Sequence, residues 1–167
     1  QTVALTLNGI TADNMEQRIG DANFSDVQWW AEWYADTGAT ASNATVTVTY
    51  NDGTTGNLTT FAAGGTIRAG RMIPLNQLIP AAVSGKYIRS INSVQLSAST
   101  ATAGNFGFTC TRPRLTMPLL LANKMEIFDW AQLGFPEIFN SSCLTIIELC
   151  STSSTGTVRG GGKIIHG

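Results

Sequence analysis

A strict two-residue alternation between residues 44 and 61 is the feature that most constrains the fold of this chain. Residues 44–50 read Ala-Thr-Val-Thr-Val-Thr-Tyr, a turn Asn-Asp-Gly-Thr-Thr-Gly follows, and residues 57–61 read Asn-Leu-Thr-Thr-Phe. Successive side chains of a strand point to opposite faces, so this pattern puts valine on one face and threonine on the other. A glycine-containing turn between two such segments is typical of an antiparallel pair. The segment therefore predicts a β-hairpin with one buried face.

Further strands are predicted on both sides of this hairpin. They cover residues 3–7, 65–71, 86–99, 105–112 and, as the two arms of a last hairpin, 143–150 and 157–165. Within the third of these, the alternation slips between Ile91 and Val94, which predicts a β-bulge. Capping residues and terminal glycines indicate a short helix at 13–20 and a second short helix or tight turn at 123–134.

The length and composition favour one all-β domain. A chain of 167 residues is close to the usual size of a single domain. Only 13% of the residues are charged, about half the usual share, and small polar residues that favour strands and turns make the chain polar instead. No linker or internal repeat divides the chain. We therefore expect a single domain over residues 1–167, an all-β, jelly-roll-like β-sandwich with one or two short helices.

A cluster of four large rings, Trp29, Trp30, Trp33 and Tyr34, is the most unusual local feature. As a strand, residues 25–34 put Trp29 and Trp33 on one face, whereas as a helix they put Trp30 and Tyr34 on one stripe. The aromatic density favours the strand. Core packing is the first interpretation of these rings. Both faces of such a strand would be aromatic, however, so we expect at least one ring to face a partner, and the four residues are the candidate partner-binding site.

The sequence contains no recognisable catalytic or metal-binding constellation. Nucleophilic catalysis by serine or cysteine normally needs a neighbouring base, and the only histidine, His166, is one residue from the end of the chain. The pair Asp129 and Glu137, next to aromatic residues, is the nearest approach to a glycosidase site, but cap or turn carboxylates explain it better. No Cys-x-x-Cys pair offers a zinc site. We therefore expect no enzymatic activity, no metal and no cofactor.

The three cysteines, Cys110, Cys143 and Cys150, cannot all be paired within one chain. Cys143 and Cys150 bracket one predicted strand, whose two ends lie too far apart for a disulfide. We expect all three to be reduced, small and buried, in a protein made in a reducing cytoplasm.

Charge and hydropathy exclude two classes of partner. The formal net charge is −1 and the basic residues are spread along the chain, so no positive field gathers nucleic acid. No run of eighteen apolar residues predicts a membrane span, and residues 1–7 have neither the charged start nor the apolar centre of a signal peptide. Neither nucleic acid nor a membrane is an expected partner.

Several phrases of the sequence resemble small virion proteins of tailed bacteriophages. They are ATVTVTYNDG at 44–53, AGRMIPL at 69–75, IRSINSVQLSAS at 88–99, TAGNFG at 102–107 and Arg-Pro at 112–113. The likeness covers roughly residues 44–135 and includes no diagnostic motif. It implies a β-sandwich that decorates or cements the phage head, or that sits at a vertex or in the tail.

The expected function is therefore that of a virion structural protein, a head decoration or minor capsid protein that binds the capsid shell and other copies of itself. Its expected location is the virion, which assembles in the host cytoplasm. The alternative is a carbohydrate-binding module, or a tail- or vertex-attached adhesion protein, with a sugar stacked on Trp29, Trp30, Trp33 and Tyr34. A glycoside-cleaving enzyme is the third and weakest candidate.

Overall fold

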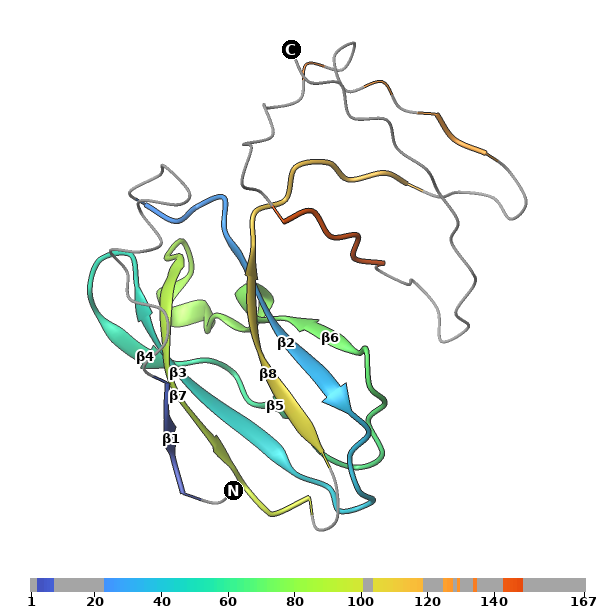
Figure 1. Ribbon diagram of the computed structural model, residues 1–167. Helices are drawn as coiled ribbons and strands as arrows, with labels where there is room; N and C mark the ends of the chain where they lie inside the picture. Colours follow the sequence, from blue (N-terminus) through green and yellow to red (C-terminus); the bar gives the residue numbers. More distant parts are fainter. Residues whose placement is uncertain are drawn as a thin grey trace. The chain divides into compact units, whose positions relative to one another are not determined.

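Eight strands and two 3-10 helices make up the regular structure of the described residues in the computed structural model (Figure 1). The structure describes residues 3–7, 23–100, 104–118, 125–127, 129, 134 and 143–148. The chain separates into two units, Gln1–Glu126 and Ile127–Gly167. All eight strands belong to the first unit. The expected single domain over 1–167 stays a prediction.

The strands of the first unit form two antiparallel sheets. In the five-stranded sheet the order is β1-β7-β3-β4, and β5 also pairs with β3. Its strands are β1 (Leu5–Thr6), β3 (Asn43–Tyr50), β4 (Thr55–Asn57), β5 (Phe61–Ala62) and β7 (Ile88–Leu96). The three-stranded sheet has the order β6-β2-β8 and consists of β2 (Gln28–Ala35), β6 (Met72–Pro74) and β8 (Asn105–Thr111).

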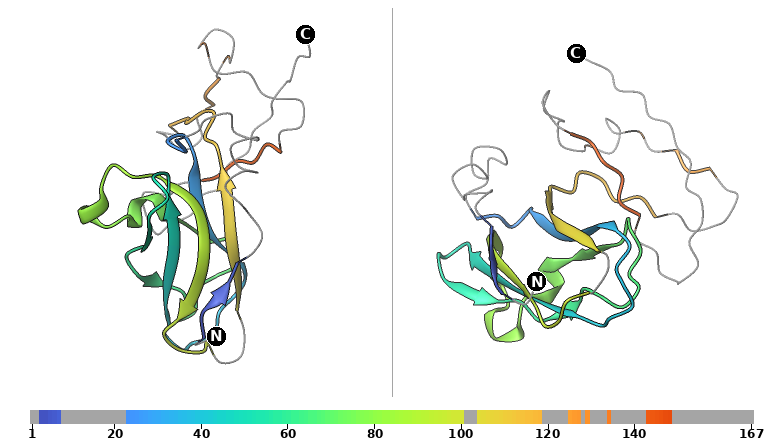
Figure 2. Two further views of the ribbon diagram at one scale, coloured as in Figure 1. Left: turned by 90° about the vertical axis from the view of Figure 1, so that its left-hand side faces the viewer. Right: turned by 60° about the horizontal axis from the view of Figure 1, so that its bottom comes forward.

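The two sheets lie as layers on either side of a common core (Figure 2). This arrangement confirms the predicted all-β sandwich. The two short 3-10 helices, η1 (Leu75–Leu78) and η2 (Ala81–Val83), follow β6. They are not at the predicted helical positions. The first of those, 13–20, lies outside the described residues, and so does most of the second, 123–134.

The hairpin predicted from the Thr/Val alternation is confirmed for its first arm, β3, which pairs antiparallel with β4 in the register Thr47↔Asn57. The predicted second arm covers 57–61, but β4 begins earlier, at Thr55, and ends at Asn57, and the chain returns to β3 only at β5. The predicted bulge is also confirmed. Along β3 the partners on β7 run from Thr47↔Ser93 directly to Val48↔Ile91, which leaves Asn92 as the extra residue. Because of this insertion, both Ile91 and Val94 are buried on the core side.

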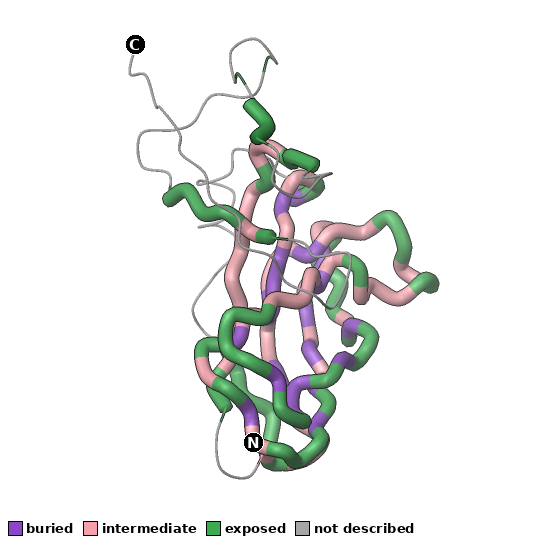
Figure 3. Tube along the Cα trace, turned by 90° about the vertical axis from the view of Figure 1, so that its right-hand side faces the viewer, coloured by how far each residue is buried: buried purple, intermediate pink, exposed green. Residues whose placement is uncertain are grey.

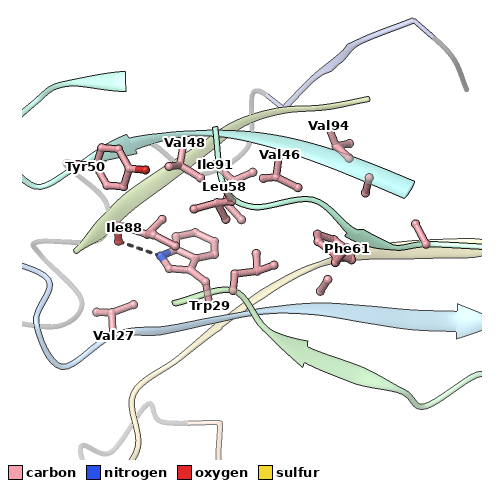
Figure 4. Close-up of a cluster of buried hydrophobic side chains, with 14 of the residues drawn as sticks. Val27, Trp29, Val46, Val48, Tyr50, Leu58, Phe61, Ile88, Ile91 and Val94 are labelled. Atoms are coloured by element: carbon pink, nitrogen blue, oxygen red, sulfur yellow. Dashed lines mark hydrogen bonds between the residues drawn. The ribbon is translucent and has the colours of Figure 1, made fainter. Parts of the chain in front are cut away.

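The core takes buried residues from the strands of both sheets, and these residues are purple in Figure 3. Trp29 of β2 donates a hydrogen bond from Nε1 to the carbonyl oxygen of Ile88 in β7, at 3.0 Å, and this bond joins the two sheets (Figure 4). Trp33 stacks on Phe106 of β8 with ring centroids 5.5 Å apart, and it meets Phe61 of β5 edge-on at 6.2 Å. Offset-stacked and edge-on contacts are the preferred geometries of aromatic pairs.

The strand predicted at residues 65–71 is wrong, because this segment is a loop that ends where β6 begins. Gly65 and Gly70 have φ angles of +87° and +83°, which an extended strand does not allow. Asp36 holds the loop, since its carboxylate accepts hydrogen bonds from the Ala69 N–H at 2.8 Å and from Arg68 Nη1 at 2.6 Å.

The strand predicted at residues 143–150 is also wrong over its described part, because residues 143–148 have no regular structure. Leu144 and Ile146 are exposed there, so no buried face stabilises an extended segment. The second arm, 157–165, lies outside the described residues. The expectation that all the cysteines are buried is wrong for Cys143, which is exposed. Cys110 is half-buried, both are free thiols, and Cys150 is not described.

Candidate functional site

The four rings of the sequence cluster lie on β2, so the strand interpretation is confirmed and the helix interpretation is wrong. Trp29 and Trp33 face the core and are each 1% exposed. Trp30 lies outside the main core cluster, on the opposite face of the strand, and is 5% exposed. Tyr34 is 52% exposed. Only one of the four predicted partner-binding rings is therefore open to a partner.

On the face of the three-stranded sheet opposite the core, three successive contacts join β2 to β8. Trp30 Nε1 donates a hydrogen bond to the Thr111 hydroxyl at 2.7 Å. The Thr109 hydroxyl donates to Glu32 Oε2 at 2.8 Å. These residues are diagonal neighbours, since the direct register pairs are Trp30↔Thr109 and Glu32↔Gly107. We call these contacts, together with that of Tyr34 on Gly107, the outer ladder.

The third contact of the outer ladder brings the ring of Tyr34 over Gly107. A Cβ atom placed on Gly107 would lie 2.9 Å from Tyr34 Cε2 and 3.0 Å from the hydroxyl oxygen. Such distances are too short for a methyl group, so only glycine leaves room for the ring in this position. An aromatic side chain laid over a glycine of an edge strand protects the backbone there from solvent.

The third strand extends the same face. Pro74 of β6 pairs with Trp30, and Met72 pairs with Glu32, so both side chains lie on the outer face beside the ladder. Both are half-buried. The face thus carries aromatic, methionine, proline and threonine side chains around a single carboxylate, Glu32, whose Oε2 is already hydrogen-bonded.

Sequence reasoning identified Tyr34 but missed Glu32, Gly107, Thr109 and Thr111. Their contribution depends on the register between β2 and β8, and β2 ends at Ala35 whereas β8 begins only at Asn105. The available signal was the alternation within each strand. It fixes which residues share a face, but not which strands are neighbours.

A second feature of the first unit is an open hollow of about 510 Å³ near the start of β2. Its walls come from residues 25–28, Asn76 and Ile79, residues 84–87, and Pro113. Hydrogen bonds hold Asn76 in the lining of the hollow. Its Oδ1 accepts from the Trp29 N–H at 2.9 Å, and its Nδ2 donates to the Val27 carbonyl at 2.9 Å. Gln28 Nε2 also donates to Asn76 Oδ1, at 3.0 Å.

The charged groups around the hollow are paired. The Lys86 ammonium lies 2.7 Å from Asp52 Oδ2 and also donates to the Thr54 hydroxyl. The hydrogen bond from Lys86, followed by those from Thr54, lowers the pKa of Asp52 from 3.8 to about 2. Asp26, in the wall, forms an ion pair with Arg112. The hollow therefore offers no free charge to attract an ion.

No cluster of three or more His, Cys, Asp or Glu side chains occurs in the described part of the chain. Asp129 is exposed, while Glu137 and His166 lie outside the description. Burial, and then the nearby Asp26 charge, raise the pKa of Cys110 to about 12, so this thiol stays protonated and is a poor nucleophile at neutral pH.

Comparisons with known proteins give no assignment. Within the described residues, no helix is long and apolar enough to cross a membrane. No protein-family model matches the chain, and no curated protein or solved structure shows significant similarity to it.

Proposed function

We propose that this protein is a non-catalytic structural subunit of a tailed-bacteriophage particle, a head decoration or minor capsid protein that binds the capsid shell and its own copies. The observation that carries the proposal is the outer face of the three-stranded sheet, with the exposed Tyr34 near the end of β2. Its location would then be the virion, which assembles in the host cytoplasm.

The chemistry of this face is that of a protein interface. Interfaces are enriched in tyrosine, tryptophan and methionine, and depleted of lysine and carboxylates. The face presents the exposed Tyr34 beside half-buried Met72, threonines and one carboxylate, whereas Trp30 on the same face is buried. Tyrosine is a common interface anchor, because it supplies a large contact area and loses little conformational freedom. Tyr34 is 52% exposed, and its ring lies over Gly107.

The low charge of the chain supports the same role. With 13% charged residues, the protein has fewer charges than a freely soluble domain of its size usually carries. A subunit that is covered on assembly has less need of a charged surface. The resemblance of residues 44–135 to small virion proteins is the reason for choosing a phage particle as the assembly.

Cosedimentation with purified particles of the parent phage tests this proposal. We expect the tagged protein to pellet with the particles at a saturable occupancy, and Tyr34→Ala to lower that occupancy several-fold while the melting temperature stays unchanged. Tyr87→Ala, at the half-buried tyrosine of the hollow, is the matched control and should bind normally. Failure of the wild-type protein to bind any particle component would refute the structural role.

A sugar-binding module is the second candidate, and the hollow is the observation that favours it. The three tryptophans are buried, so the sugar platform expected on the aromatic cluster is reduced to Tyr34. The hollow, at about 510 Å³, has the usual size of a small-molecule site. Tyr87 offers an aromatic ring, and Gln28 and Ser84 offer neutral polar groups for sugar hydroxyls.

A glycan array separates the two candidates. Sugar binding that is lost in Tyr87→Ala and kept in Tyr34→Ala would support the module. Binding lost only in Tyr34→Ala would place the sugar on the outer ladder instead. No retained glycan at millimolar concentration would exclude this second candidate.

A further inference from the structure

β8 is the last strand of the three-stranded sheet, and it is the longest edge strand in the described part of the chain. It pairs with β2 from Gln28↔Thr111 to Ala35↔Asn105, and no other described strand pairs with it. The outer edge of such a strand presents a row of backbone N–H and C=O groups that can bond to a further strand. β8 therefore carries the backbone groups needed to extend the sheet.

The other edge strands are protected in ways that β8 is not. β1 has two residues, β4 has three, and β6 has three and ends at Pro74, which lacks an N–H group. β8 has seven residues, Asn-Phe-Gly-Phe-Thr-Cys-Thr, without a charge or a proline. Natural proteins usually block long edges with lysine, proline or a bulge, because unblocked edges pair with other chains. An open edge of this length indicates a partner strand.

The side chains of β8 indicate what that partner looks like. Phe106, Phe108 and Cys110 pack against the core but are only half-buried. Gly107 and Thr109 alternate with them on the outer face. A neighbouring strand that continues both faces must also be apolar at every second position on the core side, and small or hydroxylic on the other.

A second copy of β8 meets this requirement. When two antiparallel copies are centred on Phe108, all seven residues overlap, Phe108 opposes itself, Phe106 opposes Cys110, and Gly107 opposes Thr109. Directly opposed residues of an antiparallel pair point to the same face, so both faces of the sheet continue across the junction. The pairing has the two-fold symmetry of most homodimers.

We propose that two copies of this protein join through antiparallel pairing of β8 with β8 around Phe108, so that the two three-stranded sheets form one six-stranded sheet. This inference rests on the proposed assembly role and names the partner and the bonding edge. The paired strands alone form a smaller contact than a standard interface of about 800 Å² per partner, so the dimer depends on protein concentration.

Cysteine trapping tests the register. Asn105 and Thr111 oppose each other across the proposed junction, but within one chain they are about 20 Å apart along the strand, which is too far for a disulfide. In a background with the three native cysteines changed to serine, we expect Asn105→Cys with Thr111→Cys to give an oxidised dimer crosslinked between positions 105 and 111. Asn57→Cys on β4, in the same background, controls for random collision.

Blocking the edge tests the energetics. Thr109→Lys places a charge on β8 next to Glu32, which can pair with it and preserve the fold. We expect the self-association constant, measured by sedimentation velocity, to fall at least tenfold. Thr45→Lys, on the central strand β3 of the other sheet, is the matched control and should leave self-association unchanged.

The outcomes also separate this inference from the proposed function. A monomer at all concentrations, as expected if another segment of the same chain occupies the edge, overturns the β8 pairing. So does a dimer that lacks the 105–111 crosslink and survives Thr109→Lys. If such a protein still binds particles, the structural role stands without the pairing. If the trapped dimer forms and never binds particles, the pairing stands and the structural role fails.

Discussion

The two sheets of the sandwich share a core but differ in their outer faces. In the five-stranded sheet, the central strand β3 alternates buried Val46 and Val48 with half-exposed Thr47 and Thr49. In the three-stranded sheet, β2 has tryptophan on both faces, with Trp29 toward the core and Trp30 away from it. The first sheet has the pattern of a surface in contact with water. The second has the pattern of a sheet covered on both sides.

The edges of the two sheets also differ, in the charges that they carry. The β3–β4 end of the five-stranded sheet carries the ion pair of Asp52 with Lys86, whereas β8 carries no charge along its length. Among the described residues, one sheet is therefore bordered by short strands and charges, whereas the other is bordered on one side by a longer strand without a charge. This difference predicts where substitutions will affect stability and where they will affect assembly.

The largest expected effect on stability is at Trp29. Trp29→Ala removes a buried ring and the bond to the Ile88 carbonyl, and should lower the free energy of unfolding by about 3–5 kcal/mol. Tyr34→Ala, on the exposed side of the same strand, should change it by less than about 1 kcal/mol. Urea unfolding followed by circular dichroism measures both. If both variants lost the same free energy of unfolding, Tyr34 would belong to the core, and the two faces of β2 would not differ as described.

A smaller, opposite effect is expected at Tyr50, at the end of β3. Its side chain is 1% exposed, and its hydroxyl has no hydrogen-bond partner among the described residues. Removing an unsatisfied buried hydroxyl should stabilise the fold, so we expect Tyr50→Phe to raise the free energy of unfolding by about 1 kcal/mol. Tyr34→Phe removes an exposed hydroxyl and serves as the control, with no change expected. Destabilisation by Tyr50→Phe would reveal a bonded hydroxyl.

The smallest effect concerns the charged end of the five-stranded sheet. The pKa of Asp52 is lowered to about 2, mainly by the hydrogen bond from Lys86, and so lies below the ordinary value of 3.8. A carboxyl with a depressed pKa stabilises the fold above its ordinary pKa, and this contribution is lost as the pH falls from about 4 toward 2. Asp52→Asn should flatten the pH dependence of stability in that interval.

Lys86→Met provides the check on the cause. It should return the pKa of Asp52 part of the way to 3.8, because the bonds from Thr54 remain. Titration of the Asp52 carboxyl by NMR measures the shift. An unchanged pKa in Lys86→Met would show that the lysine does not hold the carboxylate in solution.

Local pattern predicted the parts of the fold that depend on neighbouring residues. The Thr/Val alternation located β3, and the slip after Ile91 located the bulge at Asn92, because each of these signals lies within one strand. The strand prediction failed at residues 65–71. There, two glycines adopt left-handed backbone angles and Asp36 accepts a hydrogen bond from the Ala69 N–H, and both features favour a loop over a strand. The composition of that segment does not reveal a contact made thirty residues away.

The candidate site was predictable only in part, for the same reason. The sequence marked Trp29 to Tyr34 as unusual and favoured the correct secondary structure, but it could not say which ring is exposed. That depends on which face of β2 meets the five-stranded sheet. The outer ladder and the open edge follow from the pairing of β2 with β8, which no local pattern encodes.

The contact of Tyr34 on Gly107 has a counterpart in the other sheet, where the ring of Tyr50 lies against Gly56 of the edge strand β4, 3.1 Å from the position of a Cβ atom. In each sheet, a tyrosine fills the space that a missing side chain leaves on the next strand. Replacing either glycine then requires its tyrosine to move, whereas a smaller residue in place of the tyrosine would leave room for a side chain. In a family of related chains, positions 34 and 107 should therefore vary together, as should 50 and 56, and such paired variation would reveal the register of both edges to a reader who has only sequences.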